Sequence, residues 1–291
     1  MPADPPEPVD PADPAEPPAV TDARDEPVDP ADPAEPPAET DARDEPGPPP
    51  APTDARNEAL AVFGGVTVLC ASLYWIGMAV PFIKANLGGF FALAFLAVPV
   101  WLLDKRREPL ARYGIDWRPL GRGLLWGVGT TVALLGLFMV VYVWYFGAVC
   151  GDGADLLGPL GRRCDRWCGG LGHLTLTLPD GFWMAALSQL VVVAIPEEVF
   201  YRGYLMGRLD QAWPARRHLW GAPLGWALVV QALLFGFGHF LVDWNPLRLA
   251  VAIPALLFGL VRSWSGSILA PVIFHVSANL LMTVVDRSFF P

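Results

Sequence analysis

The residues best able to do chemistry lie in a part of the chain that is otherwise almost uncharged. The stretch IPEEVFYRG (195–203) holds two adjacent carboxylates, Glu197 and Glu198, followed by Arg202. A charged residue at membrane depth costs about 2.5 to 3.5 kcal/mol, so such residues are rare and are candidates for function. Helical spacing puts Glu198 and Arg202 on one face, where they can pair, and turns Glu197 about 100° away. We therefore expect one charge-compensated acid and one available acid.

Pro196 directly precedes the two acids and removes a backbone N–H from the predicted helix. We expect a kink here that opens a polar pocket beside Glu197. The alternative is a juxtamembrane charge cluster at a helix end, with Glu197 simply solvated. The motif by itself does not decide between the two interpretations.

Two later apolar segments are also interrupted by polar groups. In LLFGFGHF, His239 ends the fifth predicted span in the pattern F-x-x-x-H, and His275 and Asn279 lie four residues apart in IFHVSANLL. A single histidine in an apolar helix is more often a packed core residue than a catalyst. Buried polar groups are costly unless they meet one another, so we expect groups on three segments to converge. A carboxylate, two imidazoles and an amide are the parts of a hydrolase that activates water.

The order of these motifs is similar to that of a known family. E-E-x-x-x-R, F-x-x-x-H and H-x-x-x-N on successive hydrophobic segments resemble the CPBP family of intramembrane proteases. This family includes the CAAX prenyl endopeptidase Rce1 and bacterial self-immunity homologues. The resemblance covers roughly residues 180–285 and none of the N-terminal tail.

The resemblance implies a role for each motif residue. Glu197 and His239 would activate the attacking water, and His275 and Asn279 would stabilise the oxyanion. Glu198 with Arg202 would shape the site. The Gly236 and Gly238 pair would let helices approach closely, or would be ordinary packing glycines.

Metal dependence is open at this point. One carboxylate and two imidazoles, from Glu197, His239 and His275, could ligate zinc in the His₂Glu manner with water as the fourth ligand. The family has been described both as metalloproteases and as glutamate-dependent proteases. The zinc-protease signature H-E-x-x-H is absent from the sequence. The cofactor is therefore expected to be none, which we favour, or a divalent metal such as zinc.

Composition indicates a membrane protein with a separate acidic tail. The 291 residues are 53% hydrophobic, and the mean hydropathy is +0.39. Residues 1–58 hold 17 of the 29 acidic residues and three of the 20 basic ones. In this tail EPVDPADPAEPPAVTDARD (7–25) recurs almost unchanged at 26–44. The repeats contain too few apolar side chains to form a core. We therefore predict a disordered Pro/Asp/Ala-rich tail, either a solvated extension or an acidic docking arm.

From residue 59 onward the chain is mostly apolar stretches long enough to cross a bilayer. We predict an all-α, polytopic transmembrane helix bundle over 59–291, with the catalytic motifs in 181–286. The expected spans are 59–80, 88–103, 123–147, 181–207, 222–241, 249–264 and 267–286. Because 88–103 and 249–264 are short, six or eight spans are alternatives to seven.

Basic residues predict the orientation of these spans. They concentrate in the loops after the second and fourth spans: Lys105, Arg106, Arg107, Arg112, Arg118 and Arg122, then Arg208, Arg216 and Arg217. Both loops are expected in the cytoplasm, which places the N-terminus inside, in a bacterial inner membrane. The loop 148–180 is discordant, because it carries Arg162, Arg163 and Arg166 yet falls outside.

Three of the four cysteines lie in that discordant loop. Cys150, Cys164 and Cys168 would face an oxidising compartment, so one disulfide with one cysteine left over is expected. The alternative is a zinc site that also uses His173, although the spacing matches no common module. Cys70 lies inside a span and is expected to be a small core residue.

One geometric difficulty accompanies the proposed site. If the fifth span starts near 222, His239 lies about 25 Å along it, towards the far face, whereas Glu197 and His275 lie nearer mid-depth. A general base acts within hydrogen-bond reach or through one water, so a wide separation of His239 from Glu197 would exclude this site.

The leading function is an intramembrane endopeptidase whose partners are the lipid bilayer and a membrane-anchored protein or peptide. Its substrate could be a prenylated CAAX tail, a peptide precursor or a C-terminal sorting tail. The alternatives are a non-catalytic membrane scaffold or immunity protein with the same fold, and an ion- or proton-coupled transporter. Nothing in the sequence indicates a nucleic-acid partner.

Overall fold

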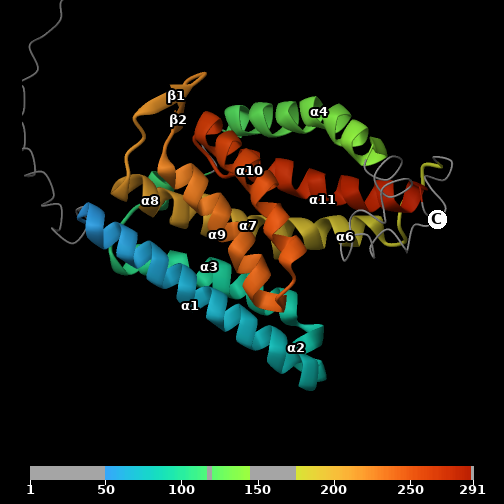
Figure 1. Cartoon of the computed structure of the whole chain (residues 1–291), viewed down its shortest axis with the longest axis horizontal. Coiled ribbons are helices and arrows are strands. Elements are labelled where there is room, and N and C mark those ends of the chain that lie inside the picture. Colours follow the sequence, from blue (N-terminus) through green and yellow to red (C-terminus); the bar gives the residue numbers. More distant parts are fainter. Residues whose placement is uncertain (1–49, 117–119, 145–174, 290–291) are drawn as a thin grey trace, which may run out of the picture. The chain divides into compact units, whose positions relative to one another are not determined.

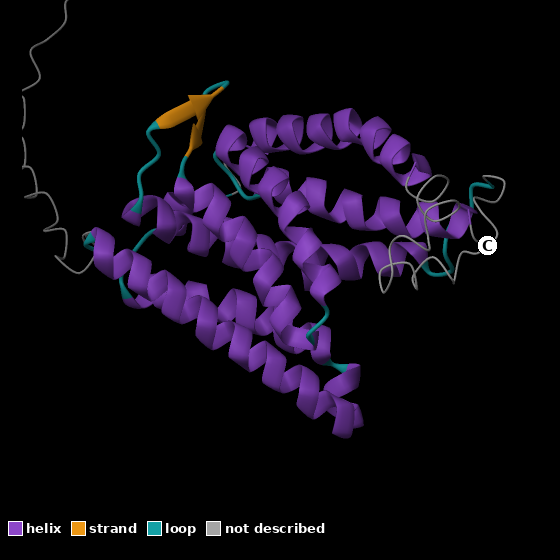
Figure 2. Cartoon of the chain, viewed as in Figure 1, coloured by secondary structure: helices purple, strands orange, loops and turns teal. Residues whose placement is uncertain are grey.

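The computed structural model describes residues 50–116, 120–144 and 175–289. These residues are almost entirely helical (Figure 2). The predicted disorder of residues 1–49 lies outside the described residues, as do the predictions for Cys150, Cys164, Cys168 and His173.

Within these described ranges, seven helical segments are long and apolar enough to cross a membrane, which confirms the predicted number. They are α1 (Pro52–Ala79), α3 (Leu87–Lys105), α4 (Leu120–Trp144), the continuous segment Phe182–Ala212, α9 (Trp226–Asp243), η6 with α10 (Pro246–Val251 and Ala252–Ser265), and α11 (Leu269–Phe289) (Figure 1). The short elements between them are α2 (Pro81–Ala85) and η1 (Leu110–Tyr113). The chain is therefore a multi-pass integral membrane protein.

Two span starts differ most from the prediction. The first helix begins at Pro52, so residues 52–58, which were assigned to the disordered tail, are helical. Pro at the first helical position and Asp54 in the first turn both favour this earlier start. The predicted start of the fifth span is instead the second strand of a hairpin, β1 (Arg217–Leu219) and β2 (Ala222–Leu224). Its two-residue turn at Trp220 and Gly221 has positive φ at both positions (48° and 82°), the geometry of a tight hairpin.

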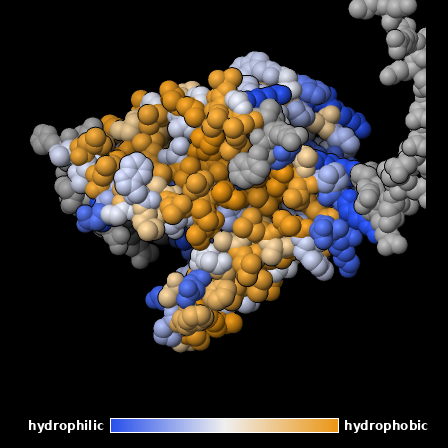
Figure 3. Space-filling view, turned by 180° about the vertical axis from the view of Figure 1, so that it is seen from behind, coloured by the Kyte–Doolittle hydropathy of each residue, from blue (hydrophilic) through white to orange (hydrophobic). Residues whose placement is uncertain are grey.

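The helices that hold the candidate site pack around one buried cluster. Side chains of α1, the fourth span, α9 and α10 form its centre, among them Phe63, Phe200, Tyr201, Phe235 and Ala255. Helix α11 packs beside α4 and α10 (Figure 1). Many large apolar side chains elsewhere are exposed and cover much of one face (Figure 3). Such a surface is stable in lipid, where it meets hydrocarbon instead of water.

A buried ionic network lies at the end of the bundle where α1 begins. Arg208, which was assigned to an exposed cytoplasmic loop, lies in the fourth span, because that helix continues to Ala212, and is fully buried. Its Nη2 lies 2.7 Å from Oε1 of Glu108, and its Nε lies 3.1 Å from Oε1 of Glu58. Arg106 pairs with the same Glu58. Burial and a hydrogen bond to Glu108 raise the pKa of the Tyr113 hydroxyl above its usual range. Arg106 and Arg208, which the sequence predicts to lie in cytoplasmic loops, therefore connect separate elements through ion pairs.

Candidate active site

The fourth span has unusual helical winding around the two glutamates. It runs through α6 (Phe182–Ser188), a π-helical stretch (Gln189–Ala194), α7 (Ile195–Glu198), a second π-helical stretch (Val199–Leu205) and α8 (Met206–Ala212). The π-helical stretches lie directly before and after the short segment that contains Pro196. Proline removes one helical hydrogen bond, and π-helical turns often occur at functional sites. The local widening changes the direction in which Glu197 and Glu198 point.

Glu198 and Arg202 form a completely buried ion pair. Nη1 of Arg202 donates to Oε1 of Glu198 over 3.0 Å, and neither side chain is exposed. The Nη2 of Arg202 donates to the backbone carbonyl of Ala255, 3.2 Å away on α10. The pair expected from the helical spacing is present, and it connects the fourth span to α10.

Aromatic rings surround the Arg202 guanidinium. Its central carbon lies 4.5 Å from the ring centre of Phe235 and 5.1 Å from that of Phe258. A cation over an aromatic face is attracted by the ring quadrupole, most strongly where water is excluded. Together with Glu198, these contacts compensate for burying the arginine charge.

His275 contacts both glutamates. Its Nδ1 lies 2.8 Å from Oε1 of Glu198, and its Nε2 lies 3.9 Å from Oε2 of Glu197. Because a carboxylate oxygen accepts, the chemistry of the first contact assigns the donor role to Nδ1–H. The second distance is too long for a direct hydrogen bond, but one water could hydrogen-bond to both atoms. The ring stacks on Phe258 at 4.7 Å, which fixes its plane.

The His239 ring, like that of His275, is oriented by a hydrogen bond at Nδ1. Its Nδ1 lies 2.9 Å from the backbone carbonyl oxygen of Phe235, one helical turn earlier. A carbonyl only accepts, so Nδ1 carries the proton and Nε2 of the neutral ring keeps a lone pair. Phe235, the first residue of the F-x-x-x-H pattern, contacts both the His239 ring and Arg202. This phenylalanine therefore links the two polar groups.

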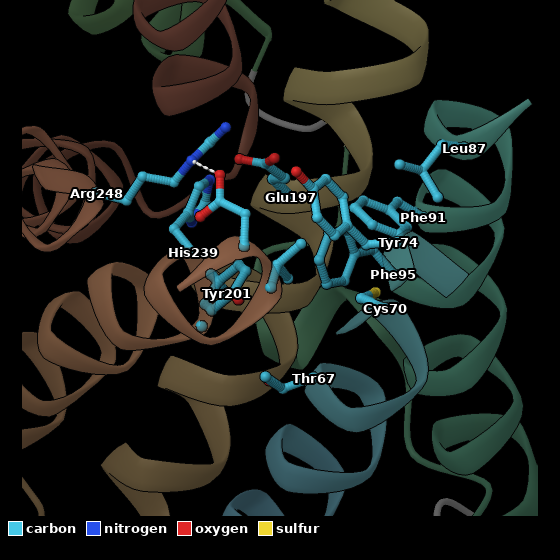
Figure 4. Close-up of a pocket in the computed structure, with 13 residues that line it drawn as sticks. Thr67, Cys70, Tyr74, Leu87, Phe91, Phe95, Glu197, Tyr201, His239 and Arg248 are labelled. Atoms are coloured by element: carbon cyan, nitrogen blue, oxygen red, sulfur yellow. Dashed lines mark ion pairs between the residues drawn. The ribbon is translucent and has the colours of Figure 1, made fainter. Parts of the chain in front are cut away.

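Glu197 and His239 line the same cavity, which has a volume of about 240 Å³ (Figure 4). The sequence raised the concern that His239 would lie too far along its helix to meet Glu197. Both side chains line this one cavity, so His239 is not too far along α9 to meet Glu197. The Glu197 side chain is 14% exposed, so the solvated charge cluster weighed as the alternative does not describe it.

Most of the cavity wall is apolar and aromatic. Tyr74, Phe91, Phe95 and Tyr201 face it together with smaller residues of α1 and α3 (Figure 4). Cys70, expected to be a core residue, is buried and lies in this wall. A wall of this kind suits apolar side chains, while a few polar groups fix the orientation of a ligand.

Sequence reasoning missed two charged residues of the cavity. Asp243 ends α9 and Arg248 lies in η6, and Nε of Arg248 is 2.6 Å from Oδ2 of Asp243 (Figure 4). The sequence signal was present in the short segment VDWNPLR, which places an acid and a base on either side of a turn. This segment lies between the predicted fifth and sixth spans, and we assigned no role to its two charges.

Asn279 has a different partner from the other motif residues. Its Nδ2 donates to Oε1 of Gln189, 2.9 Å away in the first π-helical stretch. Of the described residues, thirteen line the cavity, and neither Asn279 nor His275 is among them. One amide N–H of Asn279 is occupied, and the second is available to another acceptor.

The two glycines of α9 are sites of close approach. A Cβ at Gly236 would lie 2.8 Å from the backbone oxygen of Leu249, and one at Gly238 would lie 2.9 Å from the Tyr201 hydroxyl. Real Cβ atoms do not approach other atoms so closely. The close helix packing expected of these glycines is present, and Gly238 leaves room beside the cavity.

The three candidate zinc ligands do not gather as a ligand set. Over the described ranges, no group of three or more His, Cys, Asp or Glu side chains is arranged to hold a metal ion. Nδ1 of His239 and Nδ1 of His275 each contact an oxygen of the protein, which leaves Nε2 of both rings for another partner. The predicted set of Glu197, His239 and His275 is not among the metal-holding groups that the described residues form.

Comparison with known proteins gives one match. Residues 179–281 match the family described as "Type II CAAX prenyl endopeptidase Rce1-like". No curated protein and no solved structure matches the chain. The matched range contains Glu197, Glu198, Arg202, His239, His275 and Asn279.

Proposed function

We propose that this chain, whose residues 179–281 belong to the Type II CAAX prenyl endopeptidase Rce1-like family, is an intramembrane endopeptidase that uses Glu197 to activate water. The observation that carries the proposal is the cavity shared by Glu197 and His239. The part of the chain that the structure describes has seven helices long and apolar enough to span a bilayer, as a protease acting within a membrane requires. The substrate is a peptide segment of a membrane-anchored protein, with C-terminal sorting tails and peptide precursors as the substrate classes.

The two adjacent glutamates have different tasks in this mechanism. Glu198 is fully buried and engaged by both Arg202 and His275, so it positions the site and does not meet substrate. Glu197 is partly exposed in the cavity, where it can accept a proton from a water molecule. Nε2 of His239 holds the same water by accepting its second proton in a hydrogen bond.

The reaction then proceeds by ordinary amide hydrolysis. The water oxygen attacks the carbonyl carbon of the scissile bond while Glu197 removes a proton. The resulting oxyanion accepts hydrogen bonds from the free amide N–H of Asn279 and from Nε2–H of His275, which acts as an imidazolium whose Nδ1–H stays hydrogen-bonded to Glu198. The proton on Glu197 passes to the leaving nitrogen, the C–N bond breaks, and the carboxylate is regenerated. No step requires a metal ion.

A variant that keeps the shape of Glu197 tests the proposal. Glu197→Gln should abolish cleavage, because an amide does not accept the proton, while the protein remains as abundant as the wild type. The membrane proteome of the variant strain should contain a protein that keeps an uncleaved segment. Asp104→Asn, the same acid-to-amide change at an exposed carboxylate outside the cavity, is the matched control and should cleave normally.

Other outcomes would favour the alternatives. If Glu197→Gln leaves every membrane protein processed as before and preserves the cellular phenotype, the scaffold interpretation is correct. If purified protein in vesicles moves ions or protons in a Glu197-dependent manner, the transporter interpretation is correct.

A further inference from the structure

The cavity lies in one half of the helix bundle. Its α1 residues, Thr67, Cys70 and Tyr74, belong to the second half of that helix, and its α3 residues, Leu87, Phe91 and Phe95, belong to the first half. Consecutive antiparallel spans place these two halves at the same depth. The α9 residues, from Gly238 to Asp243, are the last turns of their helix. All of these positions lie in the same half of the bundle.

Most of the described basic residues lie at the opposite end of the bundle, whereas Lys84, Arg248 and Arg287 do not. Arg56 lies in the first turns of α1, and Glu58 nearby joins Arg106 and Arg208 in the buried ionic network. Cys70 is twelve residues beyond Glu58, which corresponds to about 18 Å along α1. The hairpin with Arg216 and Arg217 follows α8 at this end as well. In Figure 3 the hydrophilic residues are densest on the side where α1 begins and the hairpin lies.

These two observations give the cavity an orientation. Lys and Arg residues near the ends of spans concentrate on the cytoplasmic side of membrane proteins. The basic end is therefore the cytoplasmic end, and the cavity occupies the half of the bundle that faces away from the cytoplasm. Glu197 lies near the middle of its span and lines the cavity.

The Asp243–Arg248 pair lies in the cavity wall where α9 ends. The Arg248 side chain is 49% exposed, whereas Asp243 is only 12% exposed and anchors it. The turn between them is held by hydrogen bonds from the backbone N–H of Asn245 to Asp243, and of Leu247 to the Asn245 side chain. A guanidinium presented by a fixed turn can donate to the backbone carbonyls of an extended peptide.

We propose that the cavity is accessible from the non-cytoplasmic face, through a mouth formed by Asp243 and Arg248, and that its peptide substrate reaches Glu197 from that side. The apolar wall would receive the membrane-buried side chains of the peptide, and Arg248 would bind its polar backbone where it leaves the bilayer. The part of this inference that concerns a peptide rests on the proposed function. The accessibility of the cavity does not.

Thiol labelling tests the accessible face without relying on catalysis. In a background with all four native cysteines replaced by serine, Val242→Cys and Leu87→Cys each place a thiol in the cavity wall. His218→Cys, on the exposed hairpin, is the matched control for the basic end. A membrane-impermeant sulfonated methanethiosulfonate is added to right-side-out and to inverted vesicles, each reconstituted with the full chain.

The two vesicle orientations should give opposite results. The Val242→Cys thiol should react at least about tenfold faster in right-side-out vesicles, because the charged reagent does not cross the bilayer, and His218→Cys should react faster in inverted ones. If the cavity thiols react faster from the cytoplasmic side, or from the same side as His218→Cys, the proposal is overturned. Leu87→Cys gives the same readout if Val242→Cys fails to fold.

Failure of this proposal and failure of the proposed function are distinguishable. Labelling from the non-cytoplasmic side without any Glu197-dependent cleavage would support the proposed access route and exclude the protease function. Glu197-dependent cleavage with labelling from the cytoplasmic side would support the protease and exclude access from the non-cytoplasmic face.

The role of Arg248 in the mouth is tested separately. Arg248→Gln should raise KM at least about tenfold with little change in kcat, as expected for a group that binds substrate equally in the ground and transition states. An unchanged KM would exclude this role for Arg248.

Discussion

The Nδ1 of His275 lies 2.8 Å from Oε1 of Glu198, and this contact joins α11 to the fourth span inside the bundle. The same carboxylate oxygen accepts from Arg202. Glu198 is therefore the centre of a three-residue buried unit, and Glu197, one residue earlier, remains outside it. The proximity of Nε2 of His275 to Glu197 couples the buried unit to the cavity.

Removing one member of the buried pair should destabilise the protein strongly. Glu198→Gln leaves the Arg202 charge without its counter-charge, and the loss of a partner from a buried pair typically costs about 3 to 5 kcal/mol. Arg202→Met should have a similar effect. The double variant should recover much of the lost stability, because neither charge remains. Unfolding in detergent, followed by tryptophan fluorescence, measures these changes.

The corresponding control is Glu197→Gln, which alters a partly exposed carboxylate and should change stability much less. If Glu198→Gln is as stable as Glu197→Gln, Glu198 is not the positioning residue described above.

Asn279 should affect the rate more than the binding of substrate. Asn279→Ala removes one oxyanion donor, which typically lowers kcat about 10² to 10³-fold. Gln189→Ala removes only the partner that orients Asn279 and should have a smaller effect. Kinetics on the substrate identified with Glu197→Gln give the comparison. Thr283→Val, one turn later on the exposed side of α11, should leave kcat unchanged. Equal kcat for Asn279→Ala and wild type would contradict the oxyanion role.

Gly238 should tolerate no side chain. Gly238→Ala would place Cβ 2.9 Å from the Tyr201 hydroxyl and 3.4 Å from Phe63, so either Tyr201 moves into the cavity or α9 moves away. Both responses should reduce cleavage. Gly64→Ala, on α1, meets no atom within 4 Å and should stabilise its helix by up to about 1 kcal/mol. A Gly238→Ala variant with wild-type kcat and KM would show that the cavity does not depend on this approach.

Metal removal should leave cleavage intact. Glu197, His239 and His275 are not arranged as a ligand set among the described residues, and the proposed reaction uses only protein groups and water. Purified protein treated with 1,10-phenanthroline and dialysed should retain its wild-type kcat. Loss of activity that zinc restores, with one zinc per chain by elemental analysis, would replace the glutamate mechanism by a metal-dependent one.

The helices and their number followed from the sequence because hydropathy and helical period are local properties. Seven apolar stretches of sufficient length are visible without any knowledge of their neighbours. The Glu198–Arg202 pair is predictable for the same reason, since residues four apart always meet on a helix. The late end of the fourth span was missed because Arg208 reads as a loop cation, and only its partners Glu58 and Glu108 make its burial favourable.

The sequence by itself determined the membrane class of this protein, the set of polar residues available for catalysis and the pairing of Glu198 with Arg202. Only the tertiary structure decided that Glu197 shares a cavity with His239, that His275 bonds to Glu198 across 77 residues of sequence, and that Asp243 and Arg248 complete the cavity. The physical reason is that a periodic pattern fixes which residues share a helical face. The rotation of that face, and the helix it meets, are set by packing between distant segments.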